Sequence, residues 1–156
     1  MGQGQYAYPA QITRRMDPLE FEDLPDQAVL LLDSAPIIYV VEAHPRFGPR
    51  YTSLFAAQAA GRLRFAVTGI TIAEVLTGPL KARKEALARQ FRVILESWQL
   101  VDLTLEIAEN AARLRASLRL DLPDAIQAAS ALAINAAALV THDRDFSRLK
   151  SLRVIS

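Results

Sequence analysis

Four acidic residues of this 156-residue chain stand where an apolar run ends or where a helix is expected to begin. They are Asp33, Glu74, Asp124 and Asp143. In open α/β sheets, ligands bind beyond the carboxyl ends of the strands, so side chains at such positions can share one cleft. Carboxylates about 4 Å apart repel each other by roughly 4 kcal/mol per pair at an effective dielectric of 20. A cluster of them therefore indicates a bound divalent cation, and hard oxygen ligands favour Mg²⁺ or Mn²⁺ over Zn²⁺.

Each acid also has an interpretation that involves no function. Thr71 and Glu74 have the spacing of a capping box, and an acid at position 124 suits the first turn of a helix that starts near Pro123. Asp143 and Asp145 could cap the short turn DRDFSRL. Asp33 is harder to explain in this way, because a carboxylate directly after Val-Leu-Leu-Leu lies at the edge of the core and needs a donor or a cation.

The composition excludes several other kinds of site. The chain has no cysteine, which removes disulfides, thiolate zinc sites, iron–sulfur clusters and cysteine nucleophiles, and favours a reducing compartment. Its two histidines, His44 and His142, lack zinc-ligand spacing, and His142 is expected to point away from the acids. The longest apolar stretch, residues 128–140, is too short to span a membrane, and the polar N-terminus does not have a secretory apolar region. We expect a cytoplasmic protein without a membrane partner.

Strand and helix signals alternate along the chain. Strands are expected at 28–33, 64–68, 99–103 and 138–141, with a fifth candidate at 152–155. Helices are expected at 35–42, 50–62, 72–77, 80–97, 105–119 and 123–135, with Gly78 and Pro79 separating the third from the fourth. This order predicts the α/β class, in three α/β/α layers around a mostly parallel sheet of four to five strands.

The N-terminal segment differs from the rest in charge and pattern. Residues 1–28 carry two basic and five acidic residues, whereas residues 29–156 carry 16 basic and 12 acidic ones. We expect residues 1–27 to form a flexible, partly acidic arm and residues 28–156 to form the folded domain. The arm is either solvent-exposed or covers a basic surface of its own or a partner subunit.

Basic and apolar residues of the predicted helices suggest contact surfaces. The candidates for contact with a nucleic-acid backbone are Lys81, Arg83, Lys84, Arg89 and Arg92, although a solvated helix face would have the same composition. Leu54, Phe55 and the segment 91–95 could pair two subunits, but core packing is the more common use of such residues. Trp98 is assigned to the core or an interface.

Four segments together resemble a known family. LLLDSAPIIYVVE, TIAEVLTG, LDLPDAIQAASAL and LVTHDRDFSRL occur in the order and approximate spacing of the PIN-domain ribonucleases, especially the VapC-type toxins of bacterial toxin–antitoxin pairs. The resemblance covers about residues 28–156 and implies that Asp33, Glu74, Asp124 and Asp143 surround Mg²⁺ or Mn²⁺. It also implies that the hydroxyls of Ser34 and Thr141 support this quartet. Asp145 offers a second carboxylate in the last segment, and the acidic arm departs from typical members.

The resemblance implies a metal-dependent endoribonuclease that leaves a 5′-phosphate and a 3′-hydroxyl. In this mechanism Asp33, Asp124 and Asp143 hold one or two ions, while Glu74 orients or deprotonates the attacking water. The implied partners are an RNA substrate, a cognate antitoxin and a second copy of the chain.

A non-catalytic PIN-like scaffold that binds RNA or protein is the alternative. An aspartyl phosphatase is disfavoured, because Ala35 stands where a second aspartate is needed. A dinucleotide-binding module is disfavoured because the first strand lacks a glycine-rich turn after it.

Overall fold

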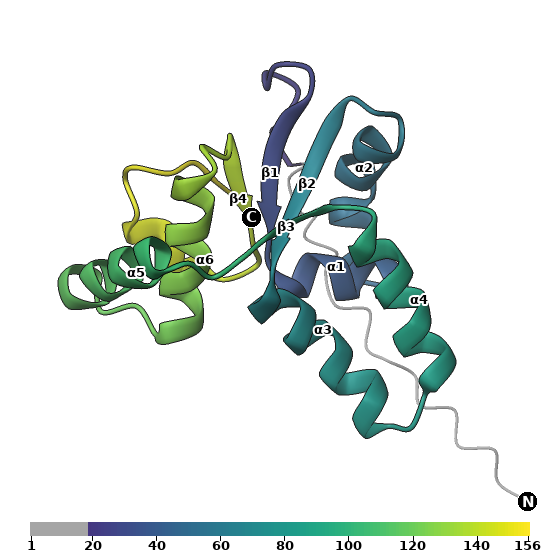
Figure 1. Cartoon of the computed structure of the whole chain (residues 1–156). Coiled ribbons are helices and arrows are strands. Elements are labelled where there is room, and N and C mark those ends of the chain that lie inside the picture. Colours follow the sequence, from purple (N-terminus) through teal and green to yellow (C-terminus); the bar gives the residue numbers. More distant parts are fainter. Residues whose placement is uncertain (1–18) are drawn as a thin grey trace, which may run out of the picture.

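The computed structural model describes residues 19–156, which form a five-stranded, fully parallel sheet between two layers of helices (Figure 1). The strands are β1 (Ala28–Leu32), β2 (Leu63–Thr68), β3 (Gln99–Val101), β4 (Ala138–Val140) and β5 (Val154–Ile155). Their spatial order is β3-β2-β1-β4-β5, so the longest strands, β1 and β2, lie at the centre. The predicted three-layer α/β/α class is confirmed.

Alternate side chains of the central strands enter two separate cores. Leu30 and Leu32 of β1 belong to one buried cluster, while Leu31 between them belongs to the other. Both sets are fully buried, as the continuous apolar run of β1 predicts for a parallel strand covered on both faces. The central strands are thus covered on both faces, and the polar residues of the predicted site lie in the loops and helices that follow the strands.

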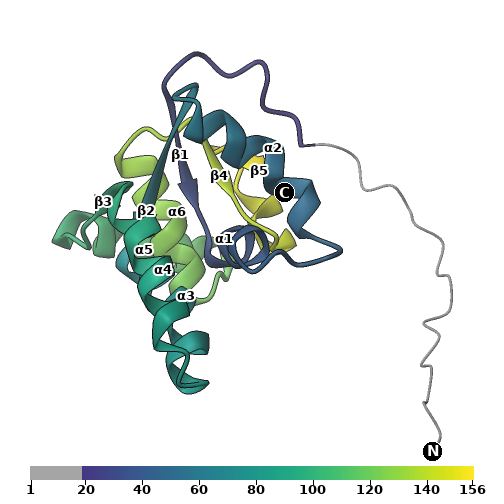
Figure 2. The same ribbon diagram turned by 90° about the vertical axis from the view of Figure 1, so that its right-hand side faces the viewer.

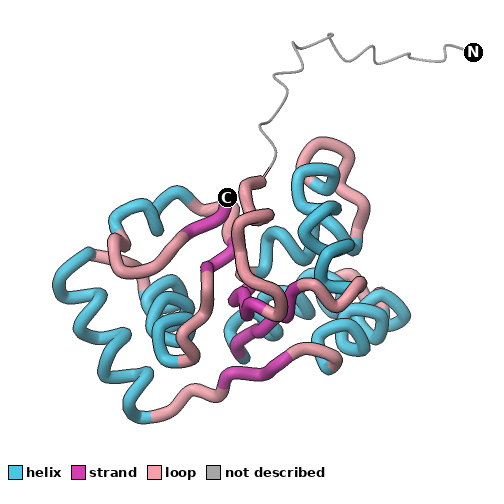
Figure 3. Tube along the Cα trace, turned by 90° about the horizontal axis from the view of Figure 1, so that it is seen from above, coloured by secondary structure: helices cyan, strands magenta, loops and turns pink. Residues whose placement is uncertain are grey.

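The helices divide between the two faces (Figure 1, Figure 3). One layer contains α1 (Ser34–Val41), α2 (Gly48–Ala59), α3 (Gly69–Lys81) and α4 (Glu85–Glu96). The other contains α5 (Leu105–Leu118), α6 (Leu122–Ala133) and the short 3-10 helix η1 (Arg144–Arg148). No helix within residues 19–156 combines the length and the hydropathy needed to cross a bilayer.

The predicted helix break at Gly78 and Pro79 is wrong, because α3 continues through both residues to Lys81. Proline removes one backbone donor and disfavours a helix interior, but here it lies near the end of α3 and is buried. The chain turns later, at Arg83, which has a φ of 55°. The amides of Arg83 and Lys84 close this turn on the carbonyls of Leu80 and Pro79.

Residues 19–27 pack onto the domain, so its folded part begins before the expected boundary at residue 28. Leu19, Phe21 and Leu24 are buried in the same core as Leu30 and Leu32. Figure 2 shows this segment arching over the end of the sheet where β1 begins. Residues 1–18 of the expected arm lie outside the described residues.

Two arginines fasten the acidic part of this segment. Arg153 donates to both carboxylate oxygens of Asp23, at 2.7 and 2.9 Å, and this bond lowers the pKa of Asp23. Arg62 pairs with Asp26 at 3.1 Å and also donates to the backbone carbonyls of Glu22 and Pro25. Two of the four described acids of the segment, Asp23 and Asp26, therefore pair with basic residues of the same chain. Whether residues 1–18 cover a basic surface stays a prediction.

The apolar residues considered for subunit pairing are mainly core residues. Leu54 and Phe91 are fully buried, and Leu95 is nearly so. Phe55 packs edge-on against Phe65 and Trp98, with ring centroids 5.1 and 5.9 Å away.

We expect Leu24→Ala to lower the free energy of unfolding by about 2–5 kcal/mol, because it removes a buried side chain from the core. Leu105→Ala is the matched control, since Leu105 is 86% exposed against 6% for Leu24, and should change stability by less than about 0.5 kcal/mol. Urea unfolding followed by circular dichroism measures both. Equal, small effects would show that residues 19–24 add nothing to the core.

Candidate active site

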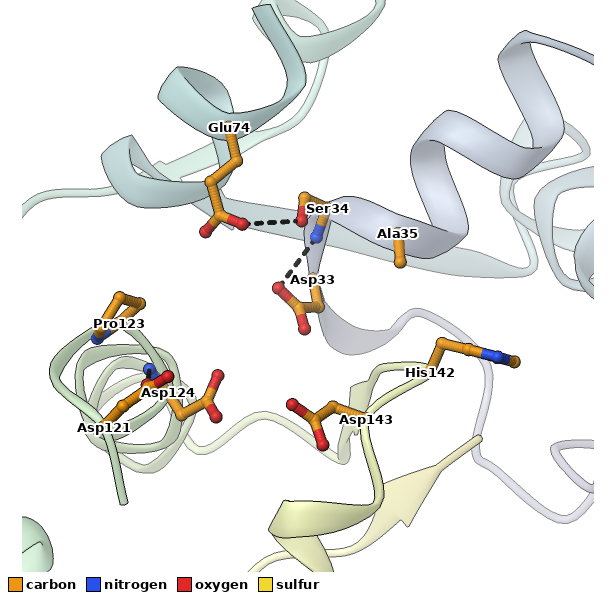
Figure 4. A pocket seen from close by; sticks show the side chains of 9 residues that line it. All are labelled: Asp33, Ser34, Ala35, Glu74, Asp121, Pro123, Asp124, His142 and Asp143. Carbon is orange, nitrogen blue, oxygen red and sulfur yellow. Dashed lines mark hydrogen bonds between the residues drawn. The ribbon is translucent and has the colours of Figure 1, made fainter. Parts of the chain in front are cut away.

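A pocket of about 390 Å³ opens at the carboxyl end of the sheet (Figure 4). It is lined by residues from four chain segments: Asp33, Ser34, Ala35, Glu74, Asp121, Pro123, Asp124, His142 and Asp143. The four acids expected to share a cleft therefore line one pocket, although they are spread over more than a hundred residues of sequence. Figure 4 shows Asp33, Asp124 and Asp143 pointing toward one another, with Glu74 entering from α3.

Asp33 is held in place by neutral donors. Its Oδ1 accepts the amide of Ser34 at 2.9 Å, which makes Asp33 the N-cap of α1, and also accepts the side-chain amide of Gln127 at 3.2 Å. Its Oδ2 accepts the hydroxyl of Thr141 at 2.9 Å. The predicted supporting role of the Thr141 hydroxyl thus corresponds to a direct hydrogen bond that fixes the carboxylate.

Gln127 is a residue that sequence reasoning missed. Its side chain is 1% exposed, and Nε2 donates to Asp33 and to Thr71 Oγ1, while Oε1 accepts from Thr68 Oγ1 at 2.6 Å. Thr71 in turn donates to the Leu32 carbonyl at 3.2 Å. The network joins α6 to β1 and α3 behind the pocket, so the position of Asp33 depends on three elements. A polar residue at the buried face of an otherwise alanine-rich helix was the available signal.

Glu74 lies in the second turn of α3, and the capping-box interpretation of Thr71 and Glu74 is wrong. The N-cap is Thr68, whose hydroxyl accepts the Thr71 amide. Glu74 instead accepts the hydroxyl of Ser34 at 3.1 Å (Figure 4). Burial raises the pKa of Glu74, and the charges of Asp33 and Asp121 add to the rise, whereas the bond from Ser34 opposes it.

Among the described acids with a shifted pKa, Asp124 has the largest shift. Burial, followed by the negative charges of Asp121, Asp143, Asp33 and Asp145, raises its pKa to about 7. The neighbouring Asp121 is the N-cap of α6 and accepts the Asp124 amide at 2.9 Å. Asp121 lines the pocket but was not among the expected site residues, although an aspartate just before Leu122-Pro123 is a recognisable helix start.

Asp143 and Asp145 both lie close to Asp124. Each of the three offers a carboxylate oxygen, and these atoms all lie within 4.8 Å of one another. Asp143 lines the pocket, and its Oδ1 accepts the Asp145 amide at 2.9 Å. Three oxygen donors at this separation, with a carboxyl whose pKa is raised by its neighbours, fit a divalent cation that favours oxygen ligands.

His142 points away from the acids, as expected (Figure 4). Its Nδ1 lies 3.3 Å from the hydroxyl of Tyr51. Burial lowers the pKa of His142, and the positive charges of Arg50, Arg144 and Arg46 lower it further. His44 is also remote from the acids: its Nδ1 accepts the amides of Arg46 and Phe47 in the loop between α1 and α2.

The five basic residues expected at a nucleic-acid backbone lie at the far end of α3 and on α4. Lys81 ends α3, Arg83 and Lys84 form the turn, and Arg89 and Arg92 lie on α4. All five are exposed, and Arg92 forms an ion pair with Glu96 at 2.7 Å. Lys81 is seven residues beyond Glu74, which is about 10 Å along a helix.

Comparisons with known proteins agree with this geometry. A family model described as the PIN domain matches residues 30–152. The chain is similar to VapBC2 from Rickettsia felis bound to a promoter DNA fragment, with 23% identity and a TM-score of 0.66. It is also similar to a toxin–antitoxin complex from Klebsiella pneumoniae, with 26% identity and a TM-score of 0.64. A third similar structure is Mycobacterium tuberculosis VapC20, a sarcin-ricin loop cleaving toxin, with 15% identity and a TM-score of 0.67. These matches cover 81% of this chain and 96%, 96% and 99% of the others. No curated protein matches.

We expect the metal-free protein to melt at a lower temperature at about pH 8 than at about pH 5.5. The pKa of Asp124 rises from an ordinary 3.8 to about 7 on folding, so the folded state binds this proton more tightly. The resulting stabilisation is complete below the unfolded pKa and is lost as pH rises through about 7. Thermal unfolding in the presence of a chelator measures it.

Asp124→Asn should flatten this pH dependence, because an asparagine side chain has no carboxyl proton to lose. Asp26→Asn makes the same chemical change in the segment 19–27 at the other end of the sheet and should leave the slope intact. Parallel curves for the wild type and Asp124→Asn would contradict the pKa shift assigned to Asp124.

Proposed function

The chain belongs to the PIN-domain family, and from this premise we propose that it is a metal-dependent endoribonuclease that acts as the toxin of a toxin–antitoxin pair. The observation that carries the proposal is the convergence of Asp33, Glu74, Asp124 and Asp143 on one open pocket. Carboxylates gathered at this density, with the pKa of Asp124 raised to about 7, are suited to binding a cation.

Asp124 and Asp143 would hold Mg²⁺ or Mn²⁺, with Asp145 as a third ligand. Asp33 lines the same pocket and would complete the set directly or through water. The bound ion would supply polarisation of a phosphate oxygen and neutralisation of charge on the leaving oxygen. The chain's own contribution is to fix the ligands, through the donors from Ser34, Gln127 and Thr141 to Asp33.

Glu74 would orient the attacking water or accept its proton. It enters the pocket from α3, opposite Asp124 and Asp143, and its Oε2 is oriented by Ser34 (Figure 4). Its raised pKa makes it a stronger base than an ordinary glutamate. Hydrolysis with cleavage of the bond to the 3′-oxygen leaves a 5′-phosphate and a 3′-hydroxyl.

The proposed substrate and partners follow from the basic surface and from the similar structures. The exposed residues Lys81, Arg83, Lys84 and Arg89, with Arg92, would contact the RNA backbone without reading its sequence. An antitoxin partner is supported by the likeness to the Klebsiella toxin–antitoxin complex, and pairing of two copies is proposed with it. A non-catalytic scaffold is less well supported, because binding alone does not require four converging acids.

We expect the purified protein to cleave single-stranded RNA with added Mg²⁺ or Mn²⁺, and a chelator to abolish cleavage. Asp124→Asn should lower the rate by about a hundredfold or more. Loss of a residue that only hydrogen-bonds to a metal ligand typically costs about 10- to 100-fold in activity, and loss of a ligand itself should cost more. Gel analysis of end-labelled RNA measures the rate and identifies the 5′-phosphate.

Asp26→Asn, at the opposite end of the sheet, should cleave like the wild type. Equal rates for Asp124→Asn and the wild type would reject the catalytic assignment and favour the scaffold.

We also expect induction of the wild-type chain in bacterial cells to arrest growth and to create new RNA 5′ ends, which RNA-end sequencing detects. Asp33→Ala should do neither, because Asp33 is the carboxylate at the centre of the hydrogen-bond network. Identical RNA ends in both cultures would count against endonuclease activity in cells.

A further inference from the structure

Five aromatic rings gather beside the acidic pocket, and the proposed hydrolysis uses none of them. They are Tyr39 of α1, His44 and Phe47 of the following loop, Tyr51 of α2 and His142 after β4. His142 lies 4.7 Å from Phe47 and 5.4 Å from Tyr39, measured between ring centroids. Phe47 lies 5.0 Å from both Tyr39 and His44.

This ring cluster begins where the pocket ends. His142 and Ala35 both line the pocket (Figure 4). Tyr39 lies four residues after Ala35 and therefore one turn further along the same face of α1. A polymer whose phosphate sits among the acids would place its neighbouring unit against these rings.

Most of the rings also keep some exposure. Tyr51 is fully buried, but Tyr39, Phe47 and His142 are only half-buried. In the aromatic group on the other side of α2, Phe65 and Trp98 are buried and Phe55 is partly exposed, but none of the three lines the acidic pocket. Partly exposed rings at a pocket rim present faces and edges on which a planar ligand can stack.

Cations lie near two of these rings, Phe47 and His142. The guanidinium of Arg46 lies 5.1 Å from the centroid of Phe47. The positive charges of Arg46, Arg50 and Arg144 all act on His142. Proteins bind single-stranded nucleic acid with two components: aromatic rings on which the bases stack, and positive charges that attract the phosphates. Both occur here.

Packing alone accounts for only part of the cluster. His44 has a structural task, because it accepts two backbone amides of its own loop. His142 enters from a different segment, after β4, and its ring packs against Tyr39 and Phe47 while it lines the acidic pocket on its other side.

We propose that the imidazole of His142, backed by Tyr39 and Phe47, is the stacking platform for the unpaired nucleobase next to the scissile phosphate, and that Arg46 and Arg144 bind the adjoining phosphates. This proposal rests on the proposed ribonuclease function. It places recognition of a base on the α1–α2 side of the pocket, whereas Lys81 and the other basic residues of α3 and α4 follow the backbone on the other side.

The test compares two probes on Asp124→Asn protein, which binds but does not cleave during the titration. One probe is a short fluorescent oligoadenylate RNA, and the other is an abasic ribose-phosphate oligomer of equal length, both with Mg²⁺. Adding His142→Leu should weaken oligoadenylate binding by about tenfold, while His142→Phe should keep it. All three proteins should bind the abasic oligomer equally, because stacking needs a base.

Loss of affinity for both probes, unchanged affinity, or a loss shared by His142→Phe overturns the platform while leaving the nuclease proposal intact. If Asp124→Asn binds neither probe and the wild type cleaves no RNA, both proposals are overturned.

Arg46→Gln tests the phosphate contacts. It should weaken binding of both oligomers and reduce the slope of log affinity against log salt by about 1. Arg64→Gln is the matched control, since Arg64 is an exposed residue near the amino end of β2, and should change neither quantity. Equal effects of the two substitutions would contradict a local phosphate site.

Discussion

Mutual repulsion among carboxylates is the constraint on which the rest of this structure depends. Asp33, Glu74, Asp121, Asp124 and Asp143 line one pocket, and the pKa of Asp124 records the cost. Burial is the largest cause of that shift, with neighbouring charges adding to it. The fold must therefore hold these acids in place against their mutual repulsion. The contacts that do so have to come from the backbone and from residues outside the acid cluster.

The parallel sheet supplies this resistance. β1 and β4 are neighbours, and the Asp33 amide donates to the Val140 carbonyl at 2.9 Å, which sets Asp33 beside Thr141. Helices then begin directly after the strands or their loops, so Asp33, Asp121 and Asp143 occupy N-caps. Asp124 lies in the first turn of α6 and Glu74 in the second turn of α3. Asp33 caps α1 and Asp121 caps α6, where helix dipoles favour negative charge by about 0.3–1 kcal/mol each.

The sequence was sufficient to predict that the four acids share one pocket, but not which contacts hold them there. Asp33 and Asp143 follow short apolar runs, and that local pattern marks strand ends without further information. The position of Gln127 on an alanine-rich helix marked it as a buried polar residue, but its partners could not be assigned. Asp33, Thr68 and Thr71 are 94, 59 and 56 residues away in sequence. The core residues Leu19 and Leu24 were missed for a similar reason. Residues 19–27 show neither the helical nor the strand period, and their apolar side chains find contacts only once the sheet has formed.

The choice of uncharged donors around Asp33 follows from the need to keep the pocket anionic. A lysine in place of Gln127 would also hold the carboxylate, but its positive charge would cancel one negative charge and compete with a metal ion. The amide of Gln127 and the hydroxyl of Thr141 fix the geometry and leave the charge in place. Their hydrogen bonds form during folding, so under the proposed function a cation would find the Asp33 carboxylate already oriented and would lose little free energy to ordering it. The folded chain therefore pays the free-energy cost of assembling the acids, and the binding of the proposed ion would offset it.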